Sequence, residues 1–139
     1  MGDSGSLLFG FIFSVLMIKM YELNQFLSPF FIILLLWYPS YETLFSIIRK
    51  YTLKKSPMKP DSKHLHQLIF YFVKKKFLYK TIYANIFTAN LINMYNLIIF
   101  IIALNFKTNT QIQIILILLN LFIYTVIYLK MFAFRYKKK

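Results

Sequence analysis

The sequence predicts an all-α integral membrane protein, with about four transmembrane helices and one amphipathic helix on the cytoplasmic side. Hydrophobic residues make up 59% of the 139 residues, more than a soluble domain of this size usually carries. They gather in long apolar runs, and most of the 17 Lys and Arg residues lie between these runs or at the C-terminus. The sequence has no cysteine, which excludes both a disulfide framework and a thiolate metal site.

The apolar runs define the expected spans, at about residues 7–20, 30–48, 83–104 and 112–132. A helix needs roughly 20 residues to cross a bilayer, and the last three runs reach this length. The first run is short unless it extends back to Ser4 or Ser6 and onward to Tyr21. Within the second run, Pro39 predicts a kink or break, because proline removes a backbone hydrogen bond and clashes with the preceding turn.

The distribution of charge predicts the orientation of these spans. The first connection carries only Lys19 and Glu22, and the last carries only Lys107. The central connection is strongly basic, with Arg49, Lys50, Lys54, Lys55, Lys59, Lys63, Lys74, Lys75, Lys76 and Lys80. Because basic loops stay in the cytoplasm, we expect a multi-pass membrane protein with both termini cytoplasmic. This alternation explains the net charge of +13 better than nucleic-acid binding does.

The chain accordingly divides into three parts. Residues 1–48 hold two spans, residues 49–82 form the basic cytoplasmic loop, and residues 83–139 hold two spans and a basic tail. In the loop, Asp61 or Ser62 is placed to cap a new helix. The apolar residues that follow fall on one face of a helix, at Leu65, Leu68, Ile69, Phe72 and Val73. We therefore expect an amphipathic helix that lies on the cytoplasmic face, with anionic lipid as a partner.

Two histidines, His64 and His66, are the only ones in the chain. On a helix, residues two apart point to different faces, so this pair can converge only at a helix start or in a loop. Among many lysines, two imidazoles suit phosphate recognition as hydrogen-bond donors. The composition alone favours the simpler interpretation, that they are solvated polar residues.

Two acids are also candidates for function. Asp3 lies at the start of the first apolar run, where it can cap a helix or act as an oxygen ligand of Mg²⁺. Glu42 follows Pro39 by three residues, either at interfacial depth or facing a polar cavity. These residues alone leave both pairs of alternatives open.

Three stretches together resemble a known family. MGDSGSLLFGF resembles the M-G-D-[ST]-G-S-x-x-x-G-F stretch of the bacterial polyprenyl-phosphate sugar-1-phosphate transferases. YPSYETLFSIIRK is similar to their P-x-x-[DE]-T-L stretch, and PDSKHLHQL to their D-R-x-H-[LI]-H-H motif. The three occur in the family's order over roughly the first half of the chain. This resemblance implies an enzyme of the bacterial inner membrane that transfers an N-acetylhexosamine phosphate from a UDP-sugar to undecaprenyl phosphate and releases UMP. The product would serve cell-wall or surface glycan synthesis.

The resemblance also implies roles for individual residues. Asp3 matches the aspartate linked to Mg²⁺ binding and to catalysis, and His64 and His66 match the first two histidines of the catalytic His-rich motif. Asp61, Lys63 and Gln67 are then expected to bind substrate. Gln67 replaces the third histidine and Ser62 replaces the arginine, which removes two cationic groups from the family pattern.

Members of that family are larger and carry a paired-aspartate motif upstream of the G-D-[ST]-G-S stretch. We therefore expect this chain to be a partial version of a larger polytopic fold, working with the missing N-terminal half or as a homo-oligomer. The alternative is a small, non-catalytic, polybasic membrane protein that binds lipid or a partner.

Overall fold

The fold is known from a computed structural model that describes residues 3–54, 56, 63–77 and 80–136, with only the backbone described for residues 3, 4 and 6. Every regular element in these ranges is an α-helix: α1 (Asp3–Leu23), α2 (Pro29–Leu35), α3 (Trp37–Thr52), α4 (Leu65–Lys76), α5 (Thr81–Asn105) and α6 (Thr110–Tyr136). The expectation of an all-α membrane fold is confirmed.

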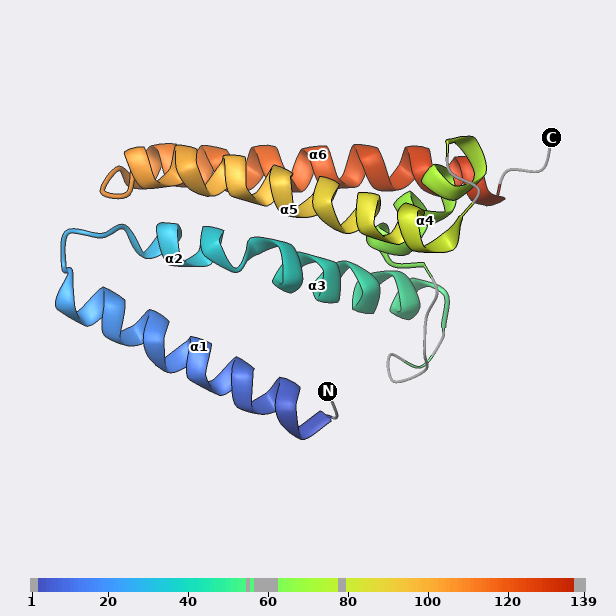
Figure 1. Ribbon diagram of the computed structural model, residues 1–139. Helices are drawn as coiled ribbons and strands as arrows, with labels where there is room; N and C mark the ends of the chain where they lie inside the picture. The colour runs from blue at the N-terminus through green and yellow to red at the C-terminus, as the bar shows by residue number, and fades with distance from the viewer. Residues whose placement is uncertain (1–2, 55, 57–62, 78–79, 137–139) are drawn as a thin grey trace.

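The helices form an elongated bundle with two distinct ends (Figure 1). The α1–α2 connection and the α5–α6 turn lie at one end, where the Ser28 amide donates to the Lys107 carbonyl at 2.9 Å. The Thr110 hydroxyl donates to the Ser28 hydroxyl at 3.1 Å and strengthens this junction. The whole of α4 and the end of α6 lie at the opposite end, which we name the α4 end, and α1 runs from the first end toward it, with its start below α3. Helix α1 diverges from the bundle toward its N-terminus (Figure 1).

Two helices, α5 and α6, are long and apolar enough to cross a membrane. Helices α2 and α3 make a third candidate span if they are taken together, although their axes differ by 71°. By length and composition, the described residues therefore supply two or three spans, where the sequence predicted about four. Helix α1 covers the first predicted span but is not among the helices that meet this test.

The bend between α2 and α3 falls at Leu36, and Pro39 explains it. A proline has no N–H to offer the carbonyl four residues earlier, here that of Leu35, and its ring clashes with that carbonyl. The helical ladder is therefore interrupted one turn before the proline, and the Ser40 amide resumes it by donating to the Leu36 carbonyl at 3.2 Å. The predicted break in the second apolar run is confirmed.

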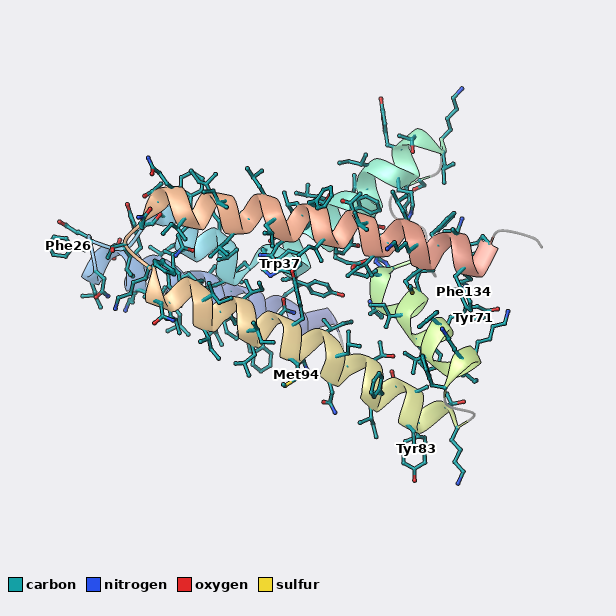
Figure 2. The ribbon with its side chains drawn as sticks, turned by 90° about the horizontal axis from the view of Figure 1, so that it is seen from above. Phe26, Trp37, Tyr71, Tyr83, Met94 and Phe134 are labelled. Atoms are coloured by element: carbon teal, nitrogen blue, oxygen red, sulfur yellow. The ribbon has the colours of Figure 1, made fainter. Side chains whose placement is uncertain are left out.

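Helix α4 packs inside the protein at its end of the bundle. Seen from above, α5 and α6 diverge from their shared turn, and α4 fills the opening between them (Figure 2). Its buried residues are Leu65, Leu68, Ile69 and Val73, four of the five that the helical pattern predicted. Tyr71 of α4 and Phe134 of α6 meet with ring centroids 6.4 Å apart (Figure 2).

The expected amphipathic helix is thus present, but its apolar face packs on α5 and α6, and its contact with anionic lipid stays a prediction. The predicted cap, in contrast, is wrong. The residue that caps α4 is His64, whose extended backbone (φ −69°, ψ 149°) precedes the first helical turn. Ser62 and Asp61, the residues expected to cap the helix, lie outside the described ranges.

Gln113 joins α5 and α6 at the other end of the bundle. Its fully buried side-chain amide donates to the Ala103 carbonyl at 2.9 Å and to the Phe106 carbonyl at 2.8 Å. These carbonyls belong to the last turn of α5 and its C-cap, and each also accepts a backbone N–H, from Phe106 and Asn109 respectively. One side chain of α6 therefore adds two hydrogen bonds to the end of α5.

We predict that Gln113→Leu will destabilise the bundle by about 1–3 kcal/mol, because it removes two hydrogen bonds from a buried site at the end of α5. Thermal or SDS unfolding of the purified protein in detergent will measure the change. Gln111→Leu is the matched control, since Gln111 is exposed on the same helix. Equal stability of the two variants would contradict this account of the α5–α6 junction.

Candidate functional site

The candidate site is built around Glu42, which projects from α3 onto the start of α4. Its carboxylate oxygen Oε1 accepts a hydrogen bond from Nδ1 of His64 at 2.9 Å and another from the backbone N–H of Leu65 at 3.0 Å. The Glu42 side chain is only 12% exposed. Since the N-terminus of a helix carries partial positive charge, this carboxylate occupies the position that an anion would otherwise take at the start of α4.

The two imidazoles lie together at this helix start. The ring centroids of His64 and His66 are 5.7 Å apart and their planes differ by 15°, so the rings stack. Such a pair is possible because His64 is the cap and still has extended backbone, while His66 is already helical. An ionised carboxylate can only accept hydrogen bonds, so with Glu42 ionised its contact with His64 requires a proton on Nδ1. Nε2 is then the other polar atom of that ring.

Positive charge on the His66 ring is limited by its surroundings. Burial lowers the pKa of His66 below its usual value, and the neighbouring His64 lowers it further, while the negative charge of Glu42 raises it in part. At neutral pH the His66 ring is therefore predominantly neutral, with one nitrogen as a donor and the other as an acceptor. The positively charged form gains population only as the pH falls through this lowered pKa.

Beside the pair, a groove of about 290 Å³ separates α4 from α5. It combines polar groups with an apolar base, and its lining residues are His66, Gln67, Phe70, Thr81, Asn85, Thr88, Ala89 and Ile92. The side-chain oxygen of Gln67 accepts from the His64 amide at 3.4 Å, which reinforces the first turn of α4. The groove thus presents one imidazole and several neutral hydrogen-bonding groups at the α4 end.

A second groove, of about 360 Å³, lies on the other side of the α4 start and holds Arg49 and Lys63. The Arg49 guanidinium donates to the Lys63 carbonyl at 2.8 Å and to the Tyr128 hydroxyl. The Lys63 ammonium lies over the rings of Phe132 and Tyr136, at 5.6 and 5.2 Å from their centroids. Arg49 and Glu42 are two turns apart on α3, so one face of α3 holds both the backbone before α4 and its first residues.

The structure separates the residues that the sequence grouped. His64, His66 and Gln67 are together, and His66 and Gln67 share one groove. Lys63 lines the other groove, with aromatic residues of α6. Asp3 starts α1, which points with its start toward the α4 end of the bundle, but the Asp3 side chain is not described, and Asp61 lies outside the described ranges.

The described residues do not by themselves fit a magnesium ion. No group of three or more His, Asp or Glu side chains within these ranges is spaced to hold a metal. Glu42 is the only described carboxylate at this place, and one of its oxygens is already bonded to His64 and Leu65. Mg²⁺ prefers a shell of oxygen ligands at octahedral geometry, which one such carboxylate cannot provide.

Two residues that organise this region, Glu42 and Arg49, are not among the site residues expected from the sequence, although the sequence left open that Glu42 faces a polar cavity. Each had a signal in the sequence. Glu42 is one of only four acids in the chain and falls near a proline break in an apolar run, where an ionisable residue usually has a polar partner. Arg49 was read only as one member of the basic loop, and its partners Lys63 and Tyr128 are too distant along the chain to be inferred from spacing.

Comparison with known proteins finds a partial relative of this chain. The chain is 35% identical over 68 residues to the undecaprenyl-phosphate alpha-N-acetylglucosaminyl 1-phosphate transferase of Thermotoga maritima. The similarity is thus to a polyprenyl-phosphate sugar phosphate transferase. The aligned region is 49% of this chain and spans 22% of the relative's length. No family model and no solved structure matches the chain.

The bundle geometry yields a topology prediction, which the absence of native cysteine makes easy to test. Cysteines introduced at Ser4 and Lys74 should react with an impermeant maleimide from the same side of the membrane, because α1 points with its start toward the end of the bundle that holds α4. A cysteine at Phe26, which is 89% exposed at the opposite end, should react from the other side. Labelling of Ser4 and Lys74 from opposite sides would exclude a shared site for Asp3 and the histidines.

Proposed function

We propose that this chain carries part of the site of an enzyme that transfers an N-acetylhexosamine phosphate from a UDP-sugar to undecaprenyl phosphate. In this reaction a phosphate oxygen of the lipid attacks the β-phosphorus of the UDP-sugar, and the bond from that phosphorus to the bridging oxygen breaks, releasing UMP. The observation that carries the proposal is the stacked imidazole pair that Glu42 holds at the start of α4. The partial relative in Thermotoga maritima supports the same class of reaction.

The geometry suggests what each residue does in that reaction. Negative charge on the phosphate oxygens is stabilised by hydrogen-bond donors that are already oriented before the reaction. His66 lines the α4–α5 groove and offers one such donor, and protonated His64 can offer a second through Nε2. Gln67 lines the same groove and adds a neutral amide donor where the family motif has histidine.

Asp3 and Mg²⁺ remain part of the proposal by family resemblance. Magnesium, when bound to such a site, neutralises charge on the diphosphate. Asp3 would supply one oxygen ligand from the start of α1, which points toward the end of the bundle that holds α4. Because the described donor set does not fit the ion, no step of the reaction is assigned to it here.

The test is a graft into the related enzyme. Residues 42–76 of this chain, from Glu42 to the end of α4, replace the corresponding stretch of the Thermotoga maritima transferase. We expect the graft to release UMP from UDP-GlcNAc in the presence of undecaprenyl phosphate. His66→Gln should then lower kcat on the order of 100-fold, as expected for the loss of one donor to a developing charge.

Lys74→Gln is the matched control, because Lys74 is an exposed polar residue of the same helix that does not line the groove. Its kcat should stay within about twofold of the unaltered graft, since exposed charges away from a site contribute little. Full activity of the His66→Gln graft would remove the imidazole pair from the mechanism.

The alternative function, a polybasic protein that binds lipid, is favoured by one feature of α4. Its last three residues, Lys74, Lys75 and Lys76, are exposed at the α4 end, and each ammonium lies within 6 Å of an aromatic ring centroid. Aromatic rings that hold ammonium groups in place are common where a protein meets the headgroups of a membrane. This lysine patch, defined as Lys74–Lys76, suits anionic lipid whether or not the chain takes part in catalysis.

Replacing all three lysines of the patch by Gln should therefore reduce the anionic phospholipid that copurifies with the protein in mild detergent. Each basic residue near a charged membrane contributes about 1 kcal/mol, so a loss of more than tenfold in relative lipid affinity is expected. Lipid quantified by mass spectrometry gives the measurement. In the graft, the same triple variant should keep UMP release, and loss of UMP release without loss of lipid would contradict the assignment of the patch to lipid.

A further inference from the structure

We propose that Glu42 is a positioning residue of this site: its carboxylate fixes the proton of His64 on Nδ1 and anchors the first turn of α4, so that both imidazoles face a substrate phosphate. This inference rests on the proposed function for its substrate, and on the geometry alone for the positioning. Glu42 itself contacts His64 and Leu65, and we assign it no contact with the substrate.

The first support is that a single oxygen makes both contacts. Oε1 lies 2.9 Å from Nδ1 of His64 and 3.0 Å from the Leu65 backbone nitrogen. The His64 ring and the first N–H of α4 are thus held by the same carboxylate oxygen. A shift of the carboxylate would move the ring and the helix start together, which is what orienting a pair of side chains requires.

The second support is that Glu42 has little freedom to move. Tyr38 of α3 and Tyr124 of α6 are close enough for their hydroxyls to act electrostatically on the carboxylate. The Tyr124 ring packs edge-on against Tyr41 with centroids 4.9 Å apart, and Tyr38 packs against Trp37. Oε2 is buried among these rings and makes no hydrogen bond of normal geometry with the described residues. The fixed orientation of the carboxylate therefore comes from Oε1 and from packing.

The third support is the chemistry of the imidazole. Free imidazole in a histidine side chain can carry its proton on either nitrogen, and the hydrogen bond at one nitrogen selects the form. With Nδ1 donating to Glu42, Nε2 of neutral His64 is an acceptor and becomes a donor when the ring is protonated.

The charged, titratable and neutral polar groups beside the imidazole pair come from α3, the start of α4 and α5. Glu42 comes from α3, His64 and His66 from the start of α4, and α5 contributes the neutral side chains Thr81, Asn85 and Thr88 to the groove beside His66. Removing the charge of Glu42 should therefore lower the pKa of His66 further, since Glu42 is the contribution that raises it.

Nitrogen NMR of the full chain in nanodiscs tests the proposal directly, because the chain has only two histidines. In a His66→Gln background, His64 gives the single imidazole signal. We expect the Nδ1–H form in the protein with Glu42, and a shift of about tenfold or more toward the Nε2–H form in Glu42→Ala, because a hydrogen bond to a charged group is lost. Glu22→Gln, a change of charge at the opposite end of the bundle, is the matched control and should leave the signal unchanged.

Leu65→Pro separates positioning of the ring from capping of the helix. Proline is tolerated at the first helical position, and the extended backbone of His64 suits a residue that precedes proline. This variant removes the backbone N–H that Glu42 accepts and should destabilise α4, but His64 should keep its Nδ1–H form. If Leu65→Pro shifts the tautomer as much as Glu42→Ala does, Glu42 acts only as a cap and the proposal is overturned.

Titration with inorganic phosphate in the same nanodiscs connects the geometry to the substrate. Glu42→Gln keeps the shape of the side chain and an acceptor oxygen but removes its charge. We expect it to weaken phosphate binding at the imidazoles by about tenfold and to lower the pKa of His66. An unchanged tautomer in Glu42→Ala would overturn the positioning role even if phosphate binds, whereas failure of the unaltered chain to bind phosphate would contradict the proposed function and leave the tautomer result standing.

Discussion

The contact between the Glu42 carboxylate and the start of α4 organises the α4 end of the molecule. A carboxylate this poorly exposed is unfavourable unless its charge is compensated, and here the compensation comes from an imidazole N–H and a helix N-terminus. Each partner gains in return, because the ring receives a fixed proton position and the helix an anion at its positive end. A break in this contact would leave a buried charge and an unsatisfied amide at the same place.

The bend between α2 and α3 brings Glu42 to this position. In a continuous helix the axis that enters the bundle at Pro29 would carry on in one direction, whereas the 71° bend at Leu36 gives α3 a direction of its own. The face of α3 that holds Glu42 then also holds Arg49, which donates to the Lys63 carbonyl just before α4. Pro39 thus influences the site through the direction that it gives α3. Two side chains of α3, Glu42 and Arg49, then bind the backbone on either side of His64, the cap of α4.

The sequence predicted what depends on local pattern. The apolar runs predicted the helices and the proline predicted the break, because length, hydropathy and the missing N–H act within a few residues. The period of Leu65, Leu68, Ile69 and Val73 predicted the buried face of α4. It could not predict the surface on which that face packs, since a lipid surface and a gap between α5 and α6 demand the same apolar stripe.

The candidate site was predicted in part for a similar reason. That His64 and His66 could meet only near a helix start follows from helical geometry, and their stacking shows the pair in that setting. Their partner Glu42 is 22 residues earlier in the chain, on a helix whose direction depends on the bend, so spacing carried no information about the contact. Lys63 was grouped with the histidines because it is adjacent in sequence, but the turn into α4 directs it to the aromatic residues of α6.

The lowered pKa of His66 sets this imidazole apart from the lysines in a chain with a net charge of +13. Lysines are abundant and would attract any phosphate, but an ammonium group is always a donor and cannot accept a proton near neutral pH. Two stacked rings resist double protonation, because the charge on one lowers the pKa of the other. In the proposed site, His66 is therefore suited to gain or lose a proton as the charge on a bound phosphate changes, a response that the surrounding lysines do not provide. The Glu42 carboxylate decides which nitrogen of the neighbouring His64 carries its proton.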